Sequence, residues 1–363
     1  MIKVSAPGRI CLFGEHQDYL QLPVITAAIN RRVELTATPR NDMKIVIDLP
    51  DIKSQEILDI SAETELEYSA QRDYFKSVYN VLFRKGLRIK QGYNCTVRGK
   101  IPINSGTSSS SALNNVWCRF LLEIGDNILP KWKGKAMTGH FSYLAEVEEF
   151  GEPGGKMDQL ATAVGEVLHI DFSNNCKITE LPTKLGSFVL GDSQEPKDTM
   201  HILASTKAPA LSAAEKIKTK LPDFEFTTFS LEQLQQYSHL ITDTEMVVME
   251  GMLHNRNICR EALLEMHKPD IDHRKIGKML TQHHRYLADN LQISTPKIEI
   301  MLEAALNAGA LGGKINGSGG GGCMFAYAPN NPEEVAEAIE SAGGKAYIIS
   351  VDEGLRVEGV MSL

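Results

Sequence analysis

Charged side chains and an imidazole are concentrated in one short segment near the start of the sequence, APGRICLFGEHQDY at 6–19. The segment contains Arg9, Glu15, His16 and Asp18. Carboxylates and an imidazole at this spacing can bind several hydroxyls at once, as recognition of a polyol requires. Charged residues that follow a strand are also common on protein surfaces, so the segment alone leaves both interpretations open.

A second segment, PINSGTSSSSA at 102–112, is a loop of small residues that leads into a predicted helix. Backbone N–H groups exposed by small residues, together with the unpaired donors of a helix N-terminus, form an anion site that a polyphosphate can fill. Nearby hydroxyls can coordinate magnesium. The loop lacks the Gly-Lys-Ser/Thr ending of a Walker A sequence, so it is not an ordinary P-loop. A flexible serine-rich loop is the alternative.

A third segment, GSGGGGCMFAY at 317–327, is a run of glycines before an apolar strand. Glycine permits backbone conformations and close approaches that side chains forbid, so this run could pack against the serine loop. A flexible turn is the alternative interpretation of a glycine run taken alone.

Hydrophobic patterning predicts the elements that must position these segments. The first half begins as a sheet, with a strand bent at Pro7-Gly8, and a helix ended by Gly165 follows Met157. A polar connector between two later strands is the predicted domain boundary, and the second half is richer in helix. The predicted strands are 33–38, 44–49, 93–98, 166–172, 187–193, 323–328, 345–351 and 355–360, and the main helices are 112–124, 231–267, 274–291, 296–308 and one opened by Asn331-Pro332.

Length and composition restrict the class of protein. A chain of 363 residues favours two domains, and 42% hydrophobic with 23% charged residues is typical of a folded globular protein. The net charge of -8 argues against nucleic acid as a partner. No basic segment followed by an apolar stretch opens the sequence, and no run approaches membrane-spanning length, so we expect a cytoplasmic protein without a membrane partner. The six cysteines are scattered, as expected for buried thiols in a reducing compartment.

Together, the three segments resemble the three signature motifs of the GHMP kinase family, in the family order. APGR, GEH and DY in segment 6–19 are similar to the galactokinase form of the first motif. AEVEEFGEPGGKMDQ at 145–159, HHRYLADNLQISTPKIE and GALGGKINGSGGGGC at 309–323 extend this similarity. About 195–280 is poorly matched. The resemblance implies an α+β fold in two domains, a ribosomal-protein-S5-domain-2-like domain at 1–182 and a ferredoxin-like domain at 183–363, with the active site in the cleft between them.

The resemblance also implies a role for particular residues in phosphoryl transfer from ATP. Asp158 is similar to the family's catalytic base and Arg9 to its partner arginine. Ser110 and Glu146 match the magnesium ligands, although four consecutive serines leave the serine uncertain by one position and Glu148 and Glu149 lie close to Glu146. The implied ATP-binding residues are Gly106, Ser108, Ser109, Ser110 and Ser111. The implied sugar-binding residues are Glu15, His16, Asp18, Gly155 and Tyr19.

The sequence departs from the galactokinase pattern at positions that affect the sugar. Leu20-Gln21-Leu22 replaces the glycines that usually follow the Asp-Tyr pair, and Gly154 replaces the usual cysteine. Segment 192–205 is only loosely similar to its galactokinase counterpart, and the tyrosine that the family places against the sugar has no clear match. The resemblance favours galactose as the substrate and galactose 1-phosphate as the product. We expect a monomer or a weak homodimer.

Other interpretations remain open at this point. A heptose, a pentose or a mevalonate-type alcohol could be the substrate, and a sensor that binds ATP and sugar without turnover is a different class of function. A dinucleotide-dependent oxidoreductase is disfavoured because no Gly-x-Gly-x-x-Gly turn follows the first strand. Adjacent histidines at 283 and 284 point in different directions on a helix, which favours packing over metal binding.

Overall fold

Two long paired strands run through the computed structural model of this chain, which describes residues 1–102, 105–173, 176–196 and 199–359. Strand β1 (Ile2–Phe13) pairs antiparallel with β2 (Val24–Pro39), and the register shifts between Pro7 and Gly8. A side chain at Gly8 would come within 2.9 Å of the Thr107 carbonyl oxygen, to which the Arg9 N–H donates. The predicted bend therefore lets the serine loop approach β1 closely.

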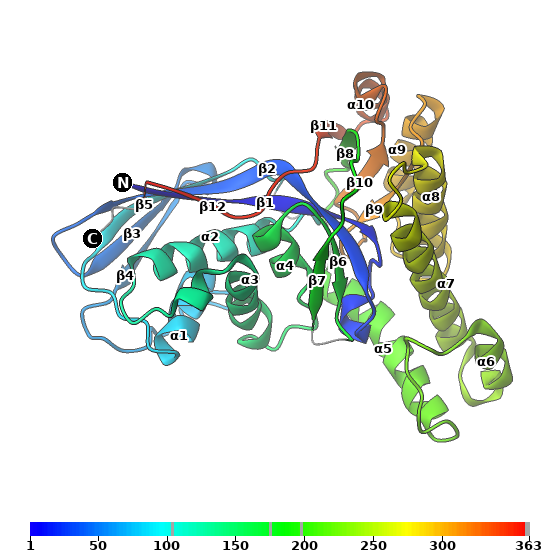
Figure 1. Cartoon of the computed structure of the whole chain (residues 1–363), viewed down its shortest axis with the longest axis horizontal. Coiled ribbons are helices and arrows are strands. Elements are labelled where there is room, and N and C mark those ends of the chain that lie inside the picture. The colour runs from blue at the N-terminus through cyan, green and yellow to red at the C-terminus, as the bar shows by residue number, and fades with distance from the viewer. Residues whose placement is uncertain (103–104, 174–175, 197–198, 360–363) are drawn as a thin grey trace.

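The first sheet has the order β12-β1-β2-β5-β3-β4, with β6 paired to β2 and β7 paired to β6. Helices α1 to α4 cover one of its faces (Figure 1), and Trp117 and Phe120 of α2 are fully buried in the shared core. The further strands are β3 (Lys44–Leu49), β4 (Ser54–Asp59), β5 (Tyr93–Gly99), β6 (Val167–Asp171), β7 (Lys177–Glu180) and β12 (Arg356–Glu358). The helices are α1 (Tyr74–Arg84), α2 (Ser109–Ile124), α3 (Lys135–Tyr143) and α4 (Met157–Val164).

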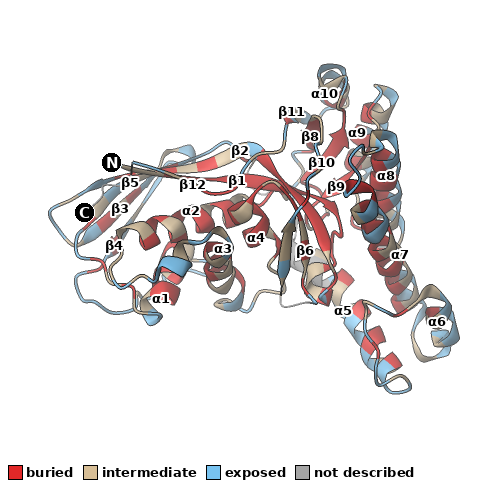
Figure 2. Cartoon of the chain, in the orientation of Figure 1, coloured by how far each residue is buried: buried red, intermediate tan, exposed pale blue. Residues whose placement is uncertain are grey.

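The second sheet is four-stranded and antiparallel, in the order β11-β8-β10-β9. Figure 2 shows that β8, β9 and β10 and the neighbouring ends of β1 and β2 are mostly buried, whereas the edge strand β11 is partly exposed. Its strands are β8 (Phe188–Asp192), β9 (Gly312–Asn316), β10 (Cys323–Tyr327) and β11 (Lys345–Ile349). The helices are α5 (Thr199–Lys218), α6 (Leu231–Gln236), α7 (Asp243–Met266), α8 (His273–Asp289), α9 (Pro296–Asn307) and α10 (Pro332–Ser341).

The structure corrects the predicted single helix at 231–267. The Ser230 hydroxyl accepts from the N–H of Gln233, and the Thr242 hydroxyl does the same for Glu245, so two capping boxes start two separate helices, α6 and α7. The prediction of one helix was wrong because apolar spacing does not mark where a helix stops, whereas the capping box at Thr242 starts a new one. The polar connector before β8 also contains a short strand, β7, which pairs with β6.

Strand β12 returns to the first sheet and pairs with β1 through Lys3 and Glu358. A boundary near 182 stays a prediction, because the end of the chain contributes to the sheet of the beginning. Within the described ranges, we find no helix both long and apolar enough to span a membrane.

Candidate active site

One cavity of about 440 Å³ brings the three motif segments together. Its walls come from β1 and the turn after it, the serine loop with the start of α2, the segment that ends in α4, and the glycine run. Every site residue predicted from the sequence lines it: Arg9, Glu15, His16, Asp18, Tyr19, Gly106, Ser108, Ser109, Ser110, Ser111, Glu146, Gly155 and Asp158. Ile103 and Asn104 of the predicted loop, and Lys197 and Asp198 of segment 192–205, lie outside the described residues.

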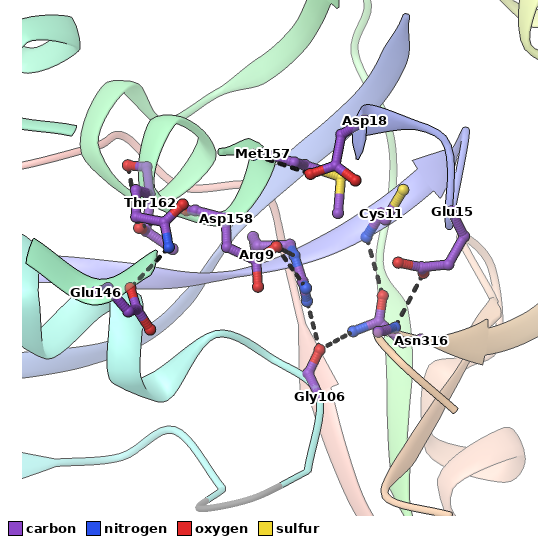
Figure 3. Close-up of polar contacts among 12 residues, drawn as sticks. Arg9, Cys11, Glu15, Asp18, Gly106, Glu146, Met157, Asp158, Thr162 and Asn316 are labelled. Atoms are coloured by element: carbon purple, nitrogen blue, oxygen red, sulfur yellow. Dashed lines mark hydrogen bonds and ion pairs between the residues drawn. The ribbon is translucent and has the colours of Figure 1, made fainter. Parts of the chain in front are cut away.

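An arginine–carboxylate pair lies in this cavity. Arg9 of β1 contacts Asp158, in the first turn of α4, with Nε and Nη2 at 2.9 and 2.7 Å from Oδ1. Arg9 also donates through Nη1 to the Gly106 carbonyl, which accepts a second bond from Asn316 (Figure 3). Burial acts to lower the pKa of Arg9, but the charges of Asp158 and Glu15 raise it overall, so the guanidinium stays charged. The pair fixes a carboxylate and a cation together at the cavity wall.

The serine loop presents donors to the cavity. Ser108 adopts a left-handed conformation with φ of 60° directly before α2, and its buried Oγ has no hydrogen-bond partner among the described residues. The first N–H groups of α2 have no partner within the helix, as at any helix N-terminus. An unpaired hydroxyl beside free backbone donors fits an anionic ligand such as a phosphate.

The glycine run packs against this loop, as the sequence predicts. A side chain at Gly317 would come within 2.7 Å of the Gly106 carbonyl oxygen, and one at Gly322 would come equally close to that of Ser105. The N–H of Cys323 donates to the same Ser105 oxygen at 2.7 Å. Glycine is therefore required here because the backbones of the two loops touch.

Glu146 is the carboxylate of its segment that faces the cavity. It lies in a π-helical turn, Leu144–Glu148, and accepts from Gln159 Nε2 at 2.7 Å. Burial raises its pKa, against hydrogen bonds from Ser110 and Ser111 that lower it. Glu148 is exposed and Glu149 pairs with Arg84, so neither competes for the cavity.

The oxygens of Glu146 and Ser110 fit a magnesium ion. Hard oxygen ligands suit this ion, which keeps several waters and needs few protein contacts. No group of three or more histidine, cysteine or acidic side chains suited to a metal occurs among the described residues.

Asp18, Gly155 and His16 also line the cavity. Asp18 accepts from the N–H groups of Tyr19 at 3.0 Å and Met157 at 3.3 Å, and a side chain at Gly155 would overlap its carboxylate. His16 Nε2 lies 2.9 Å from the Ser318 carbonyl oxygen, and its Nδ1 contacts the Tyr19 hydroxyl at 3.3 Å. Burial, followed by the charge of Asp158, raises the pKa of Asp18 from 3.8 to about 6.

Replacing Asp18 with asparagine is expected to raise the melting temperature of the ligand-free protein at pH 8. The raised pKa means that the folded protein binds the proton more tightly than the unfolded chain does, so stability falls as the pH rises from 3.8 to about 6 and stays lower above that. The difference should shrink as the pH falls from 6 to 4 and vanish below that. Thermal unfolding of both proteins across this range measures it.

A matched substitution tests the predicted direction of the change in melting temperature. Hydrogen bonds from Ser61 lower the pKa of Asp59, so Asp59→Asn should lower the melting temperature at pH 8. A decrease for Asp18→Asn as well would show that its backbone hydrogen bonds outweigh the effect of burial.

Sequence reasoning missed the partner of Glu15. The Lys314 ammonium lies 2.8 Å from Glu15 Oε2 and also donates to the carbonyls of Cys11 and Ile315. Both side chains are buried, and the N–H of Gly317 donates to the same Glu15 oxygen. A lysine and Asn316 in an otherwise apolar strand before the glycine run were the available signal. Glu15 thus links the turn after β1 to β9 as well as lining the cavity.

Two cavity-lining residues were missed by the sequence interpretation. Arg72 and Tyr74, before and at the start of α1, line the cavity although no motif pointed to them.

His284 contacts Glu299 at 2.7 Å and accepts from the N–H of Ile315, while His283 stacks on Phe13. These contacts favour packing as the role of the two adjacent histidines.

Family comparisons identify the class of protein. A model of the GHMP kinase N-terminal domain matches residues 73–166, and one of the GHMP kinase C-terminal region matches 259–346. A galactokinase galactose-binding signature matches 2–39. The chain belongs to the GHMP kinase family. The predicted recognition and the two-domain α+β fold class are confirmed.

Individual relatives divide between two kinds of GHMP kinase. The chain is 28% identical to a mevalonate kinase of Thermococcus onnurineus, with 99% of both chains covered. It is 25% identical to a galactokinase of Haemophilus influenzae, with 98% of this chain and 94% of the relative covered. Lactococcus lactis galactokinase complexed with galactose has the same fold, with a TM-score of 0.82, 22% identity and 98% and 95% coverage. The chain is therefore a GHMP kinase of the sugar and alcohol kinase type.

Proposed function

We propose that this GHMP kinase transfers the γ-phosphoryl group of ATP to a sugar hydroxyl, and that galactose is its substrate, giving galactose 1-phosphate. The galactose-binding signature over residues 2–39 carries the proposal. That segment supplies Arg9, Glu15, His16, Asp18 and Tyr19 to one cavity wall. A wall of carboxylates and an imidazole suits a ligand with several hydroxyls.

Asp158 acts as the general base in this proposal. It accepts the proton of the attacking hydroxyl as the sugar oxygen bonds to the γ-phosphorus and the bond from that phosphorus to the bridging oxygen of ADP breaks. Arg9, whose Nη2 lies 2.7 Å from Asp158, stabilises negative charge on the sugar oxygen. Ser108 and the N–H groups at the start of α2 orient the triphosphate. Magnesium on Ser110 and Glu146 would supply neutralising charge when bound.

Mevalonate is the second candidate, because curated mevalonate kinases reach slightly higher identity than the galactokinases. Mevalonate carries its own carboxylate, which would be repelled by Asp18, a cavity carboxylate with no ion-pair partner among the described residues. The galactose signature and this charge favour a neutral sugar. A heptose, a pentose and a non-catalytic sensor remain alternatives that the same assay separates.

ADP release with magnesium and ATP tests the proposal across galactose, other hexoses, a pentose, a heptose and mevalonate. We expect the highest kcat/KM with galactose. Higher kcat/KM with another sugar would reassign the substrate, and preference for mevalonate would reject the sugar assignment. No turnover together with binding of ATP and galactose would favour the sensor.

Gly155→Ala is expected to raise KM for galactose by about tenfold or more, because the new methyl group would displace Asp18 from its hydrogen bonds. Gly99→Ala is the matched control, since Gly99 does not line the cavity and its methyl group would meet only Val33, at 3.8 Å. Steady-state kinetics with galactose varied at saturating ATP measures both. Equal KM values for the two variants would remove Gly155 and Asp18 from the sugar site.

A further inference from the structure

Cationic side chains are scarce in the cavity that we assign to ATP. Its described lining includes the carboxylates of Glu15, Asp18, Glu146, Glu152 and Asp158, but only two lysine or arginine side chains, Arg9 and Arg72. Arg9 is paired with Asp158, and the serine loop has no cation of its own. Lys314 neutralises Glu15 from outside the lining, but Asp18 and Glu146 have no ion-pair partner among the described residues. A triphosphate that entered here would therefore meet uncompensated negative charge. Arg72 is the remaining guanidinium that lines the cavity.

The backbone around Arg72 is firmly held. Asp73 accepts from the N–H and hydroxyl of Ser69 at 3.1 and 2.8 Å, and the N–H of Tyr74 donates to the Arg72 carbonyl at 2.8 Å. Arg72 itself has a φ of 63°, which is unfavourable for a residue with a side chain. The ring of Tyr74 packs on Phe150, close in sequence to Glu152. The turn therefore holds a fixed position next to the segment that follows Glu146.

The Arg72 side chain has donors available. Nε and Nη2 contact the two carboxylate oxygens of Glu152, the second at 3.0 Å, while Nη1 has no partner within the described ranges. The side chain is 42% exposed, and that of Glu152 is 16% exposed. Glu152 therefore orients the guanidinium and leaves part of its donor set open to the cavity. A guanidinium with open donors suits a phosphate oxygen.

We propose that Arg72, oriented by Glu152, binds the phosphates of the nucleotide in the cavity that it lines together with Arg9. The inference rests on the proposed function, because it assumes that a nucleoside triphosphate occupies the serine loop. Arg72 is a phosphate-binding residue in this proposal and takes no part in proton transfer. It supplies the positive charge that the loop lacks.

Equilibrium binding of ATP, ADP and adenosine to the intact protein, with magnesium and without sugar, tests this inference. Arg72→Gln is expected to weaken ATP binding about tenfold or more and adenosine binding less than twofold, because only phosphates attract the charge. KM for ATP should rise in parallel, with KM for galactose unchanged. An equal loss for adenosine and ATP would overturn the phosphate assignment.

Arg84→Gln is the matched control. Arg84 lies on α1, is 41% exposed and pairs with Glu65 and Glu149, but it does not line the cavity. The Arg84→Gln variant should bind ATP with an affinity within twofold of that of the original protein. Equal weakening of ATP binding by both variants would show that Arg72→Gln acts only through the overall charge of the surface.

Glu152→Gln separates a binding role from a structural one. If the ion pair only holds the turn in place, removing either partner should weaken ATP binding equally. If Arg72 binds phosphate, the glutamine variant should bind ATP at least as tightly as the original protein, because its amide oxygen still accepts from the guanidinium while a competing negative charge is removed. If the original protein binds ATP and Arg72→Gln binds it equally well, this inference fails while the proposed function stands. No ATP binding by the original protein would overturn both.

Discussion

Replacing Asp158 with asparagine is expected to lower kcat by about 100-fold or more, the range typical for loss of a general base. Asparagine has nearly the same shape but cannot accept the proton of the attacking hydroxyl. The side chain is one-third exposed, at 31%, and lies at the cavity wall, so the fold should tolerate the change. ADP release gives kcat, and thermal shifts with ATP and with galactose report whether binding survives.

Asp59→Asn is the kinetic control for this substitution. Asp59 ends β4, is exposed and does not line the cavity, so its kcat should stay within twofold of the original protein. Unchanged kcat in Asp158→Asn would exclude Asp158 as the base. A loss of both ATP and galactose binding would instead indicate that Asp158 mainly holds Arg9 in place.

The second large effect expected is on stability. Lys314→Met should lower the free energy of unfolding by about 3–5 kcal/mol, because it leaves the buried carboxylate of Glu15 without its cation. The Lys314 and Glu15 side chains are 0% and 2% exposed and lie 2.8 Å apart. The lysine also satisfies the carbonyls of Cys11 and Ile315, which would lose a donor. Denaturant unfolding measures the change.

Lys3→Met is the matched control for Lys314→Met. Lys3 pairs with Glu34 at 2.9 Å, nearly the same distance, but on the surface. Water screens this pair, so its removal should leave the unfolding midpoint within experimental error. Combining Lys314→Met with Glu15→Gln should restore part of the stability, because no unpaired charge stays buried. Equal midpoints for the Lys3 and Lys314 variants would contradict the importance of burial.

These two substitutions probe different links within one network. The Gly106 carbonyl accepts from both Arg9 and Asn316, so the serine loop is tied to β1 and to β9 at a single atom. Glu15, in the turn after β1, and Lys314 of β9 make a parallel link. The proposed base and its arginine therefore depend on contacts between the first and second sheets.

The sequence by itself determined the local parts of this protein. The bend at Pro7-Gly8, the end of α4 at Gly165 and most strands follow from short patterns, because backbone preference and alternation act over a few residues. The three motif segments and segment 145–159 together contain every predicted residue that lines the cavity. Their chemistry requires glycines, serines and carboxylates at fixed local spacing, and such spacing can be read directly from the amino-acid sequence.

Only the tertiary structure decided the contacts between distant segments. The π-helical turn places Glu146 in the cavity and leaves Glu148 exposed, a choice that helical periodicity cannot make. Lys314 meets Glu15, and Arg72 meets Glu152, across long separations in sequence. Burial and Coulomb energy depend on distance in space, so the charge balance of the cavity appears only once the two sheets and their loops are assembled.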